Sequence, residues 1–567
     1  MELLEKHFDI AFTAPDGIKR LRELVLTLAM QGKLVPQDQN EQPASELLKE
    51  IEAEKQHLVK KGKIKKPKPL LEIKLEEVPY KLPHGWVWVR LGDIGIIGSS
   101  SRVLQNDWRD SGVPFYRARE IVKLSKQGFV NNELFITEEL FQSLTSSGLS
   151  PAPGDVMITG VGTIGVPYVV KEEDKFYFKD ASVLIFKNQF KISPLFLSRF
   201  FESHHWISSI HKESMGTTVH TLTIVRANEA IIPLPPRAEQ HRIVAKIDQL
   251  MARCDELEKL RTEREKKRTI VHTSAVNRLL SAQETNKFIN AWQFIAKHFG
   301  ELYLAKENVT ELRKTILQLA VMGKLVPQNT NDQPVSELLK DIEADKRRLV
   351  KEGKIKVPKT LSEIKPEEVP YRLPNGWKWV RVNEFVDVGT GSTPATTNRD
   401  YYNGDIPWYT SSATNKLFAD KPETFITDKA IKDTNCKIFP SGTLIIAMYG
   451  QGKTRGQISE IETPGATNQA IAAMVFYSSS KEIKNYLKYF FIKIYEEIRS
   501  IAEGAAQPNL NVGKIKNTLV PLPPLAEQRR IVAKIDQLMA LCDNLDKQID
   551  ASTQKQSTLL NAVMAQI

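Results

Sequence analysis

Two glycine-rich loops hold the residues best suited by type and spacing to bind a nucleotide. The first runs from Gly160 to Gly165 and fits the Gly-x-Gly-x-x-Gly pattern of dinucleotide-binding loops. The second reads Gly-Gln-Gly-Lys-Thr from residue 450, but Ala447 stands where a phosphate-binding loop has its first glycine. Both folds need a helix directly after the loop, whereas Pro167 follows the first loop and Arg-Gly-Gln-Ile follows the second. We therefore predict two β-hairpins and no nucleotide site.

No other catalytic pattern is complete in this sequence. It contains no His-Glu-x-x-His zinc motif and no Asn-Pro-Pro-aromatic element of an amino-methyltransferase. His204 and His205 lack a third ligand at a suitable spacing, so a structural role is the better interpretation. Cys254, Cys436 and Cys542 form no Cys-x-x-Cys pair, which argues against a disulfide framework and a thiolate zinc site. We predict neither catalysis nor a bound metal.

The chain is a tandem repeat. Leu21–Arg90 aligns without a gap to Leu312–Arg381, and 48 of these 70 positions are identical. A second repeated block begins with Pro-Leu-Pro-Pro at residues 233 and 521 and continues into Ala-Glu-Gln-x-Arg-Ile-Val. Such repetition indicates a duplicated structural frame.

The two inserts between the repeated blocks scarcely resemble one another. They have 140 and 137 residues, at 91–230 and 382–518. The two halves should therefore share scaffolding and partners but not targets. The predicted domains are an N-terminal helical frame (1–80), a first variable domain (81–236), a central helical and coiled-coil region (237–371), a second variable domain (372–524) and a C-terminal coiled-coil helix (525–567).

The frames read as helices. Leu21, Leu24, Val25 and Leu28 form one apolar face, and Gly32 is a plausible stop. After each Pro-Pro the apolar residues step by four and three, which is typical of a coiled-coil seam. Two such helices of roughly 60 Å would pack most economically as an antiparallel, pseudo-twofold spacer. The predicted seam residues are Ile243, Ile247, Leu250, Cys254 and Leu257, and Ile531, Ile535, Leu538, Cys542, Leu545 and Ile549.

The net charge of +11 is unevenly distributed. The two inserts carry −1 and +1, whereas residues 231–381 carry +9. A basic stripe favours a nucleic-acid partner. A charged helix facing solvent would produce the same pattern, and the near-neutral inserts are unexpected for DNA readers.

Three motifs together suggest a family. Leu-Pro-x-Gly-Trp-x-Trp opens each insert, Pro-Gly-Asp-Val-Met-Ile (153–158) precedes the first hairpin, and Pro-Leu-Pro-Pro-x-Ala-Glu-Gln-x-Arg-Ile-Val closes each insert. As a set they resemble the specificity subunit of type I DNA restriction–modification systems over nearly the whole chain. The second insert departs from this pattern, with Pro-Ser-Gly-Thr-Leu-Ile at 440–445.

The resemblance implies an α+β fold with two mixed α/β target recognition domains on a helical spacer. Each domain would read one half of a split, asymmetric site in double-stranded DNA. The frames would dock two modification subunits and, through them, restriction subunits, directing adenine methylation or ATP-dependent restriction. The chain itself would be non-catalytic, with S-adenosylmethionine, ATP and Mg on the partner subunits. The alternative is a coiled-coil scaffold without DNA specificity.

DNA-contacting residues are expected on the hairpins and polar loops of the inserts, where binding groups usually lie. Arginine and lysine suit guanine edges, and asparagine and glutamine suit adenine. For the second hairpin, mere exposure to solvent remains an equal alternative. The predicted residues are Arg117, Arg119, Lys123, Thr163, Thr218 and His220 in the first insert, and Ser411, Asn415, Gln451, Lys453, Arg455, Gln507 and Asn509 in the second.

No apolar run approaches the roughly 18 residues of a membrane span, and the first 12 residues are too charged for a signal peptide. We therefore expect a cytoplasmic protein without a membrane partner.

Overall fold

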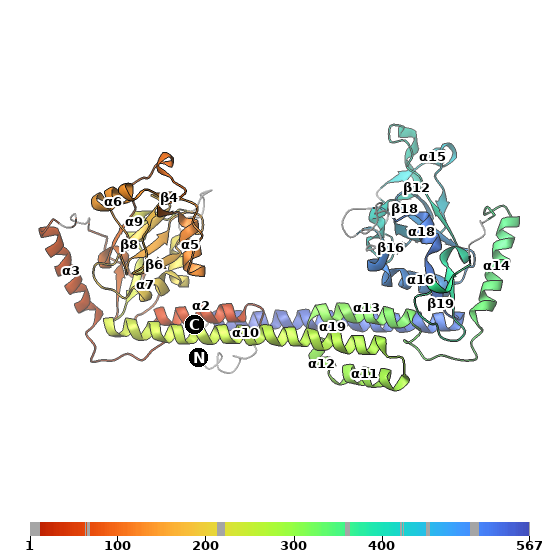
Figure 1. The fold of residues 1–567 in the computed structure, drawn as a ribbon, viewed down its shortest axis with the longest axis horizontal. Coiled ribbons are helices and arrows are strands. Elements are labelled where there is room, and N and C mark those ends of the chain that lie inside the picture. The colour runs from red at the N-terminus through yellow and green to blue at the C-terminus, as the bar shows by residue number, and fades with distance from the viewer. Residues whose placement is uncertain are drawn as a thin grey trace. The chain divides into compact units, whose positions relative to one another are not determined.

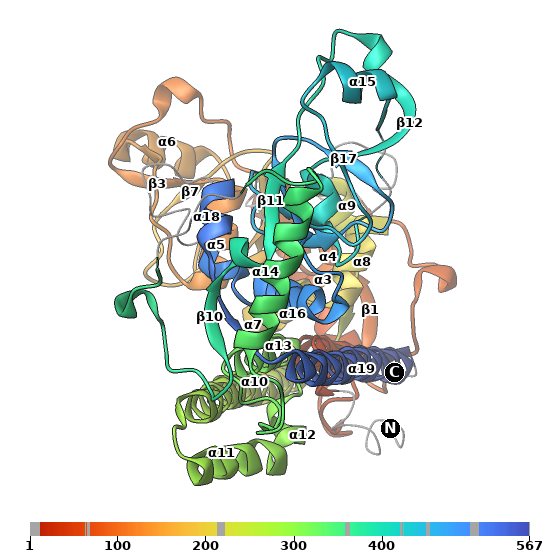
Figure 2. The ribbon, with the colours of Figure 1, turned by 90° about the vertical axis from the view of Figure 1, so that its right-hand side faces the viewer.

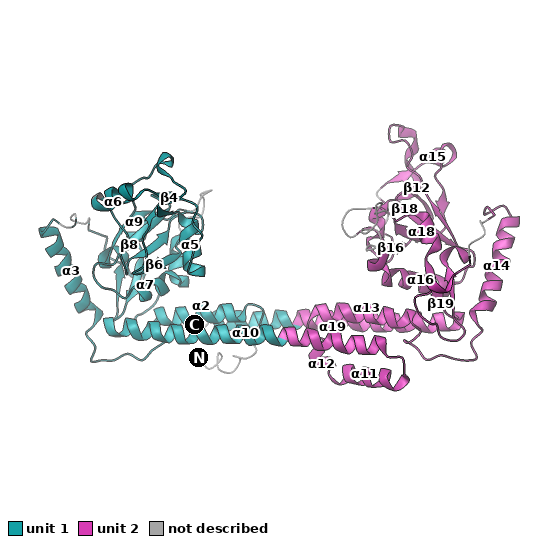
Figure 3. Ribbon diagram, viewed as in Figure 1, with its two compact units in different colours: residues 1–264, 552–567 teal, residues 265–551 magenta. Residues whose placement is uncertain are grey.

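The computed structural model describes residues 12–62, 64, 69–212, 221–357, 363–419, 422, 424–449, 454–498 and 510–565. They form two compact units, shown in Figure 3: residues 1–264 with 552–567 (unit 1), and residues 265–551 (unit 2). Each unit mixes helices and sheets, which confirms the predicted α+β class and tandem repeat. Within the described residues, every helix is too short or too polar to cross a bilayer.

The helical frame of unit 1 consists of α2 (Gly17–Met30) and α3 (Ala44–Lys60). The predicted apolar face of α2 packs inward, and the predicted stop is confirmed at Gly32, whose φ of +67° lies in the left-handed region. A Cβ on Gly32 would also clash with the Pro83 ring, so both backbone and space require glycine here.

The first recognition domain is opened and closed by one antiparallel strand pair, β1 (Val87–Arg90) with β9 (Ile231–Leu234). Inside it lie a four-stranded and a three-stranded sheet. The first has the order β2 (Ile96–Gly98), β8 (Val183–Lys187), β5 (Val156–Thr159), β6 (Pro167–Val169), and the second the order β4 (Phe135–Ile136), β3 (Val113–Tyr116), β7 (Tyr177–Phe178).

Short helices cover these sheets. The apolar side of α5 packs on the four-stranded sheet, where Ile121 and Leu124 contact a core containing Met157 and Ile185. Figure 1 shows α6 at the end of unit 1 farthest from α2. The helices are α4 (Leu91–Ile94), α5 (Ala118–Gln127), α6 (Glu138–Ser147), α7 (Pro194–Phe201), α8 (His204–Lys212) and α9 (Ile224–Glu229), with 3₁₀ turns at Leu75–Glu77 and Gln105–Asp107.

Unit 2 repeats the frame with α13 (Lys306–Val321) and α14 (Val335–Lys351), preceded by α11 (Thr285–Lys297) and α12 (Phe299–Leu302). β10 (Lys378–Arg381) pairs with β19 (Leu519–Leu522) as β1 pairs with β9. One inner sheet has the strand order β11 (Val386–Thr390), β18 (Ile471–Phe476), β15 (Leu444–Ala447), β16 (Ile458–Glu460). The other inner sheet has the strand order β13 (Phe425–Ile426), β12 (Tyr402–Tyr409), β17 (Gly465–Thr467), β14 (Ile438–Phe439).

Helices α15 (Asp428–Asp433), α16 (Lys481–Lys493) and α18 (Val512–Asn517) complete the second recognition domain. Figures 1 and 2 place β12 and α15 at the end of unit 2 farthest from α13. The 3₁₀ turns η3 to η6 are Pro366–Glu368, Val382–Glu384, Arg399–Tyr401 and Ser411–Asn415.

The two inserts share one topology although their sequences differ. In both, the four-stranded sheet has the same strand order, and a hairpin forms its edge (β5–β6 and β15–β16). In both, one strand pair of the second sheet is parallel, β3 with β7 and β12 with β17. The predicted hairpins are thus confirmed as strand pairs, and β14 is an additional strand of the second domain.

Two long helices follow the recognition domains, α10 (Arg237–Ser281) and α19 (Leu525–Ala565). α10 begins in unit 1, but its residues from 265 belong to unit 2, where Ala275 and Leu279 share a core with Ile316 of α13. The last part of α19 belongs to unit 1, where Leu560 packs with Phe12 and Leu24. Each unit thus includes the end of a helix that starts in the other unit.

The predicted seam is largely buried. Ile243, Ile247, Cys254, Ile531, Ile535 and Cys542 are at most 2% exposed, and Leu250, Leu538, Leu545 and Ile549 are half-buried. Leu257 was predicted wrongly, because it is 45% exposed. At this level α10 contacts α2 through ion pairs of Arg22 with Asp255 and Glu258.

Candidate nucleic-acid interface

By their positions in the sequence, the predicted DNA-contacting residues belong to three segments that recur in both recognition domains. The first place is the connection after β3 or β12, with Arg117, Arg119 and Lys123, or Ser411 and Asn415. The second is the hairpin β5–β6 or β15–β16, with Thr163, or Gln451, Lys453 and Arg455. The third is the segment before α9 or α18, with Thr218 and His220, or Gln507 and Asn509.

Six of these residues lie outside the described residues: Thr218, His220, Gln451, Lys453, Gln507 and Asn509. They stay predictions.

In the connection after β3, two arginines share one buried carboxylate. Arg117 precedes α5 and donates to Glu120 through Nε (3.1 Å) and Nη2 (3.0 Å). Arg119 donates from Nε to the same carboxylate (2.5 Å) and is also paired with Glu133. Glu120 is only 2% exposed. Burial alone would raise the pKa of this carboxyl, but the hydrogen bonds from Arg117 and Arg119 outweigh burial and lower it.

These contacts change how the two arginines can act. A guanidinium already paired with Glu120 has fewer N–H groups left for a guanine edge. Arg119 is half exposed and could exchange Glu133 for a phosphate, whereas Arg117 is held more firmly by the buried Glu120. Lys123 is exposed on α5. The Arg-x-x-Glu spacing at the start of α5 is the sequence signal that would have revealed this network.

The hairpin between β5 and β6 is held rigidly from both sides. The Thr159 hydroxyl donates to the Thr163 carbonyl (2.5 Å) and accepts from the Val166 amide (2.9 Å). The Gly165 carbonyl accepts a hydrogen bond from Nε1 of the buried Trp206 (3.0 Å). Thr163 is exposed at this turn. Trp206, which is fully buried, is therefore a positioning residue that sequence reasoning missed.

The segment before α9 lies against this hairpin. The Leu222 amide donates to the Gly160 carbonyl (2.8 Å), and Val161 forms an isolated bridge with Thr221. The second and third predicted places are therefore neighbours in the first domain.

In the second domain the connection after β12 lies beside the β15–β16 hairpin. Ser411 and Asn415 belong to η6, where Ser411 is half-buried and Asn415 is exposed. The following residue, Lys416, accepts a hydrogen bond at its carbonyl from the Ser459 hydroxyl of β16 (2.7 Å). Arg455 is half-buried in the hairpin. The first and second predicted places are therefore neighbours here.

A buried carboxylate attaches each recognition domain to its long helix. Glu239 accepts from Trp86 Nε1 (2.9 Å) and Gln37 Nε2 (3.1 Å). Glu527 accepts from Trp377 Nε1 (2.9 Å) and Gln328 Nε2 (2.6 Å) in the same way. Burial raises the pKa of both carboxyls. We call these two sites the Trp–Glu–Gln joints. The glutamate of the repeated Ala-Glu-Gln motif is the sequence feature from which they could have been predicted.

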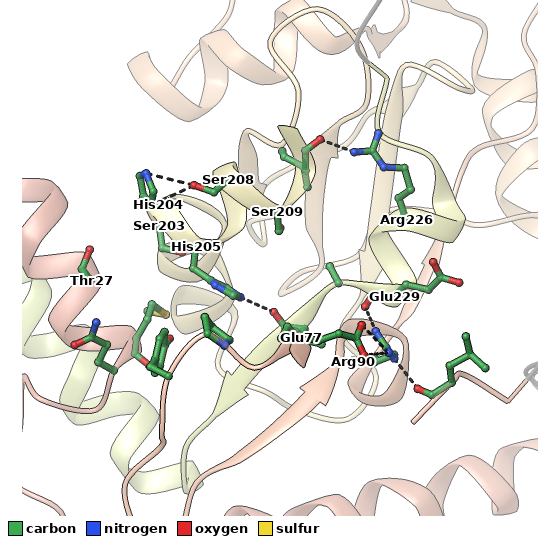
Figure 4. Close-up of a pocket in the computed structure, with 18 residues that line it drawn as sticks. Thr27, Glu77, Arg90, Ser203, His204, His205, Ser208, Ser209, Arg226 and Glu229 are labelled. Atoms are coloured by element: carbon green, nitrogen blue, oxygen red, sulfur yellow. Dashed lines mark hydrogen bonds and ion pairs between the residues drawn. The ribbon is translucent and has the colours of Figure 1, made fainter. Parts of the chain in front are cut away.

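A second joint fixes the linker before β1 to the same domain. Arg90 is buried and donates to the carbonyls of Leu71 (2.7 Å) and Glu229 (2.5 Å) and to the Glu77 carboxylate. Arg381 repeats the contact with Glu368 (2.9 Å). Beside Arg90 lies a cavity of about 630 Å³ (Figure 4), which His204 and His205 also line.

The two histidines of this cavity fit the structural interpretation. His205 contacts the Ile231 carbonyl (3.1 Å), and burial lowers its pKa, so the neutral ring is favoured. His204 contacts Ser208 instead. The described residues contain no group of three or more His, Cys, Asp or Glu that could hold a metal ion.

Comparisons with known proteins agree with this architecture. A family model described as the type I restriction modification DNA specificity domain matches residues 83–266 and 374–554. The type I restriction enzyme EcoAI specificity subunit of Escherichia coli is 33% identical over 96% of this chain and 93% of its own length. The EcoEI specificity subunit of Escherichia coli is 31% identical with the same coverage.

A solved structure, the HsdS subunit from Thermoanaerobacter tengcongensis, is 20% identical and has a TM-score of 0.44, over 86% of this chain and 98% of that chain. The family model covers more than half of the chain, and two relatives match nearly its whole length. The chain therefore belongs to the family of type I restriction–modification DNA specificity subunits, and it carries two of the family's DNA specificity domains.

Proposed function

We propose that each recognition domain reads one half of an asymmetric, split DNA site. One observation supports this proposal above all: the two recognition domains share one strand topology but carry different polar side chains at equivalent places. The Trp–Glu–Gln joints are the same in both domains, whereas Arg117 and Arg119, before and within α5, correspond in place to Ser411 and Asn415 of η6. A shared support with different polar side chains gives two readers of different sequence.

The duplicated frames support a second part of the proposal, that two modification subunits bind, one to each frame, and recruit restriction subunits. The ion pairs of Arg22 with Asp255 and Glu258 recur as those of Arg313 with Asp543 and Asp546, so equivalent helical surfaces exist in both units. The modification subunits would methylate adenine, and S-adenosylmethionine, ATP and Mg would bind to the partner subunits. This chain would position them without catalysing a step itself.

The decisive test of the two-reader proposal is a domain exchange. Residues 91–230 are replaced by the corresponding insert of a relative, and the sites methylated by the assembled complex are mapped by sequencing. We expect one half of the target to change and the other half to remain, because residues 382–518 and both frames are untouched. A reciprocal exchange of 382–518 is the matched control and should alter the other half. Rewriting of both halves by a single exchange would refute separate reading.

Stoichiometry is tested separately by native mass measurement of the chain saturated with modification subunits. Two subunits per chain are expected, and a persistent one-to-one complex would contradict docking on both frames.

A scaffold without DNA specificity is the remaining alternative. It predicts that gel shift or footprinting, with and without the modification subunit, detects no preference for the mapped site.

A further inference from the structure

Helix α14 carries a shallow groove in unit 2. The groove has a volume of about 680 Å³ and is lined by one face of α14 together with Lys378 at the start of β10. Val335 and Ile342, on another face of the helix, are buried in the core, and Leu339 of the groove packs against the same core, so the charged side chains of the groove are not what holds the helix in place.

The same face of α3 in unit 1 provides an internal comparison. Nine residues line the groove, and six of them are identical in the aligned repeat, including Lys340, Glu343 and Lys351. The three that differ all add a cation. They are Arg347 in place of Gln56, Arg348 in place of His57, and Lys378 in place of Val87. Five cations and one carboxylate thus face the groove, where the α3 face has two lysines and one carboxylate.

These cations are accessible and only weakly engaged. Arg347 and Arg348 are 76% and 63% exposed, and they pair with Glu343 (3.4 Å) and Asp345 (2.8 Å) along the helix. Exposed ion pairs of this kind contribute little to stability, so the phosphates of a polyanion can replace the carboxylate partners of these arginines. Lys351 and Lys378 make no ion pair among the described residues.

The charge of the whole chain indicates what such a groove binds. The excess of positive charge lies in residues 231–381, which contain α14, and not in the recognition inserts. DNA affinity depends strongly on cations that neutralise phosphates. Figure 1 shows α14 on the other side of the second recognition domain from β16. When a DNA duplex is bound at the β15–β16 hairpin, only base pairs beyond the half-site can therefore contact the groove.

We propose that the α14 groove binds the phosphate backbone of DNA flanking the second half-site, and that α3 makes no equivalent contact at the first. This inference rests on the proposed reading of split DNA sites. It gives the two ends of the recognised duplex unequal roles, because only one flank contributes to affinity.

The test replaces the three groove cations by the residues of the other repeat: Arg347→Gln, Arg348→His and Lys378→Val. Because α3 folds with these residues, the variant should fold. Affinity is measured with the full chain in complex with its modification subunits, on two duplexes carrying the site mapped from methylated DNA. One duplex ends about three base pairs beyond the second half-site, and the other extends about twenty base pairs further.

We expect the variant to bind the long duplex about tenfold or more weakly at low salt, with the slope of log affinity against log salt reduced by about 2 to 3. On the short duplex the variant and the wild type should agree. Extending the flank of the first half-site should make no difference to either protein. The reciprocal variant, Gln56→Arg with His57→Arg, should gain affinity from an extended first flank.

A matched charge control replaces Arg264, Lys266 and Lys267, exposed on α10, by glutamine. An equal, flank-dependent loss in this control would mean that net charge alone is responsible, and the inference would be wrong. Unchanged binding of the groove variant to the long duplex would also overturn it. If that variant instead lost modification subunits, the groove would be a protein-docking surface. If the wild type showed no site preference on either duplex, the proposed function itself would have failed.

Discussion

The two recognition domains have the same strand order but hold their hairpins by different means. In the first, Trp206 anchors the hairpin through the Gly165 carbonyl, and α5 has ten residues. In the second, Gly456 occupies the corresponding position beside Tyr495, and a five-residue η6 takes the place of α5. The parts that touch the frame are thus repeated, while the parts that present polar side chains are not. Topology is maintained by the frame contacts and the core, which leaves the recognition surface free to differ.

The largest difference in stability between the two domains is expected when the glycine of each hairpin, Gly165 or Gly456, is replaced by alanine. Both have positive φ, +80° for Gly165 and +84° for Gly456. A Cβ on Gly165 would clash with Ile210 and lie 2.7 Å from Trp206 Nε1, whereas on Gly456 its nearest neighbour is Tyr495 at 3.4 Å. Gly165→Ala should reduce the free energy of unfolding by about 2–5 kcal/mol, and Gly456→Ala by about 1–2 kcal/mol.

Urea denaturation followed by tryptophan fluorescence measures this difference, and methylation mapping should show a weakened first half-site for Gly165→Ala alone. Equal losses from the two substitutions would mean that the hairpins are held alike.

The Trp–Glu–Gln joints should respond identically in the two domains. Trp86→Phe and Trp377→Phe each remove one donor from a buried carboxylate, so each should lower the free energy of unfolding by about 1–3 kcal/mol. Trp88→Phe is the control, because Trp88 is half-buried and its Nε1 makes only a 3.3 Å contact with the Tyr80 carbonyl. A joint substitution no more harmful than this control would show that the joints do not fasten the domains.

The pH dependence of stability should also be the same at both joints. Burial raises the pKa of Glu239 and Glu527 above their ordinary value of 4.5. Below that value both folded and unfolded states are protonated, and the stabilising effect is fully present. As the pH rises through the raised pKa, this stability is lost, because the unfolded state ionises more readily.

Glu239→Gln and Glu527→Gln should therefore gain stability relative to the wild type between pH 4 and 7, as measured by thermal unfolding at each pH. A constant difference across this range would indicate that neither carboxyl has a raised pKa.

The smallest effects are expected from the repeated ion pairs of the frames. Arg22→Ala and Arg313→Ala should each lower the free energy of unfolding by about 0.2–1 kcal/mol, because most of their partners are exposed. Arg313→Ala should be slightly more harmful, since Asp546 is 29% exposed whereas its counterpart Glu258 is 58% exposed. Unfolding at low and high salt checks both values, and a loss that survives high salt would indicate packing instead of charge.

Local features of the fold could be predicted where the sequence repeats or alternates visibly. The stop at Gly32 and the hairpin strands on either side of Gly160 and Gly165 follow from residue type and spacing. The common topology of the inserts could not be predicted. It depends on pairings between distant strands, such as Tyr116 with Phe178, which different apolar residues can form equally well.

The candidate interface was predictable as a set of places but not residue by residue. Arg117 and Arg119 were chosen for their charge, which says nothing of the carboxylate that shares their donors. Leu257 followed the heptad spacing and still lies exposed, while Asp255 and Glu258 beside it on α10 pair with Arg22 of α2. Glu239 was overlooked because a glutamate beside Pro-Pro resembles a surface residue until its partners Trp86 and Gln37 are known.

The exchange of helix ends has a consequence for how the protein is made. Phe12 and Leu24 are among the first described residues to leave the ribosome, yet their core is completed by Leu560, among the last. The sheets of the first recognition domain and its core around Met157 and Ile185 lie within residues 87–234, whereas its other core also includes Val25 of α2 and Ile243 of α10. Its helical support cannot be finished until translation has passed the second copy. The core around Leu24 is therefore completed only by a segment that is translated after the second copy.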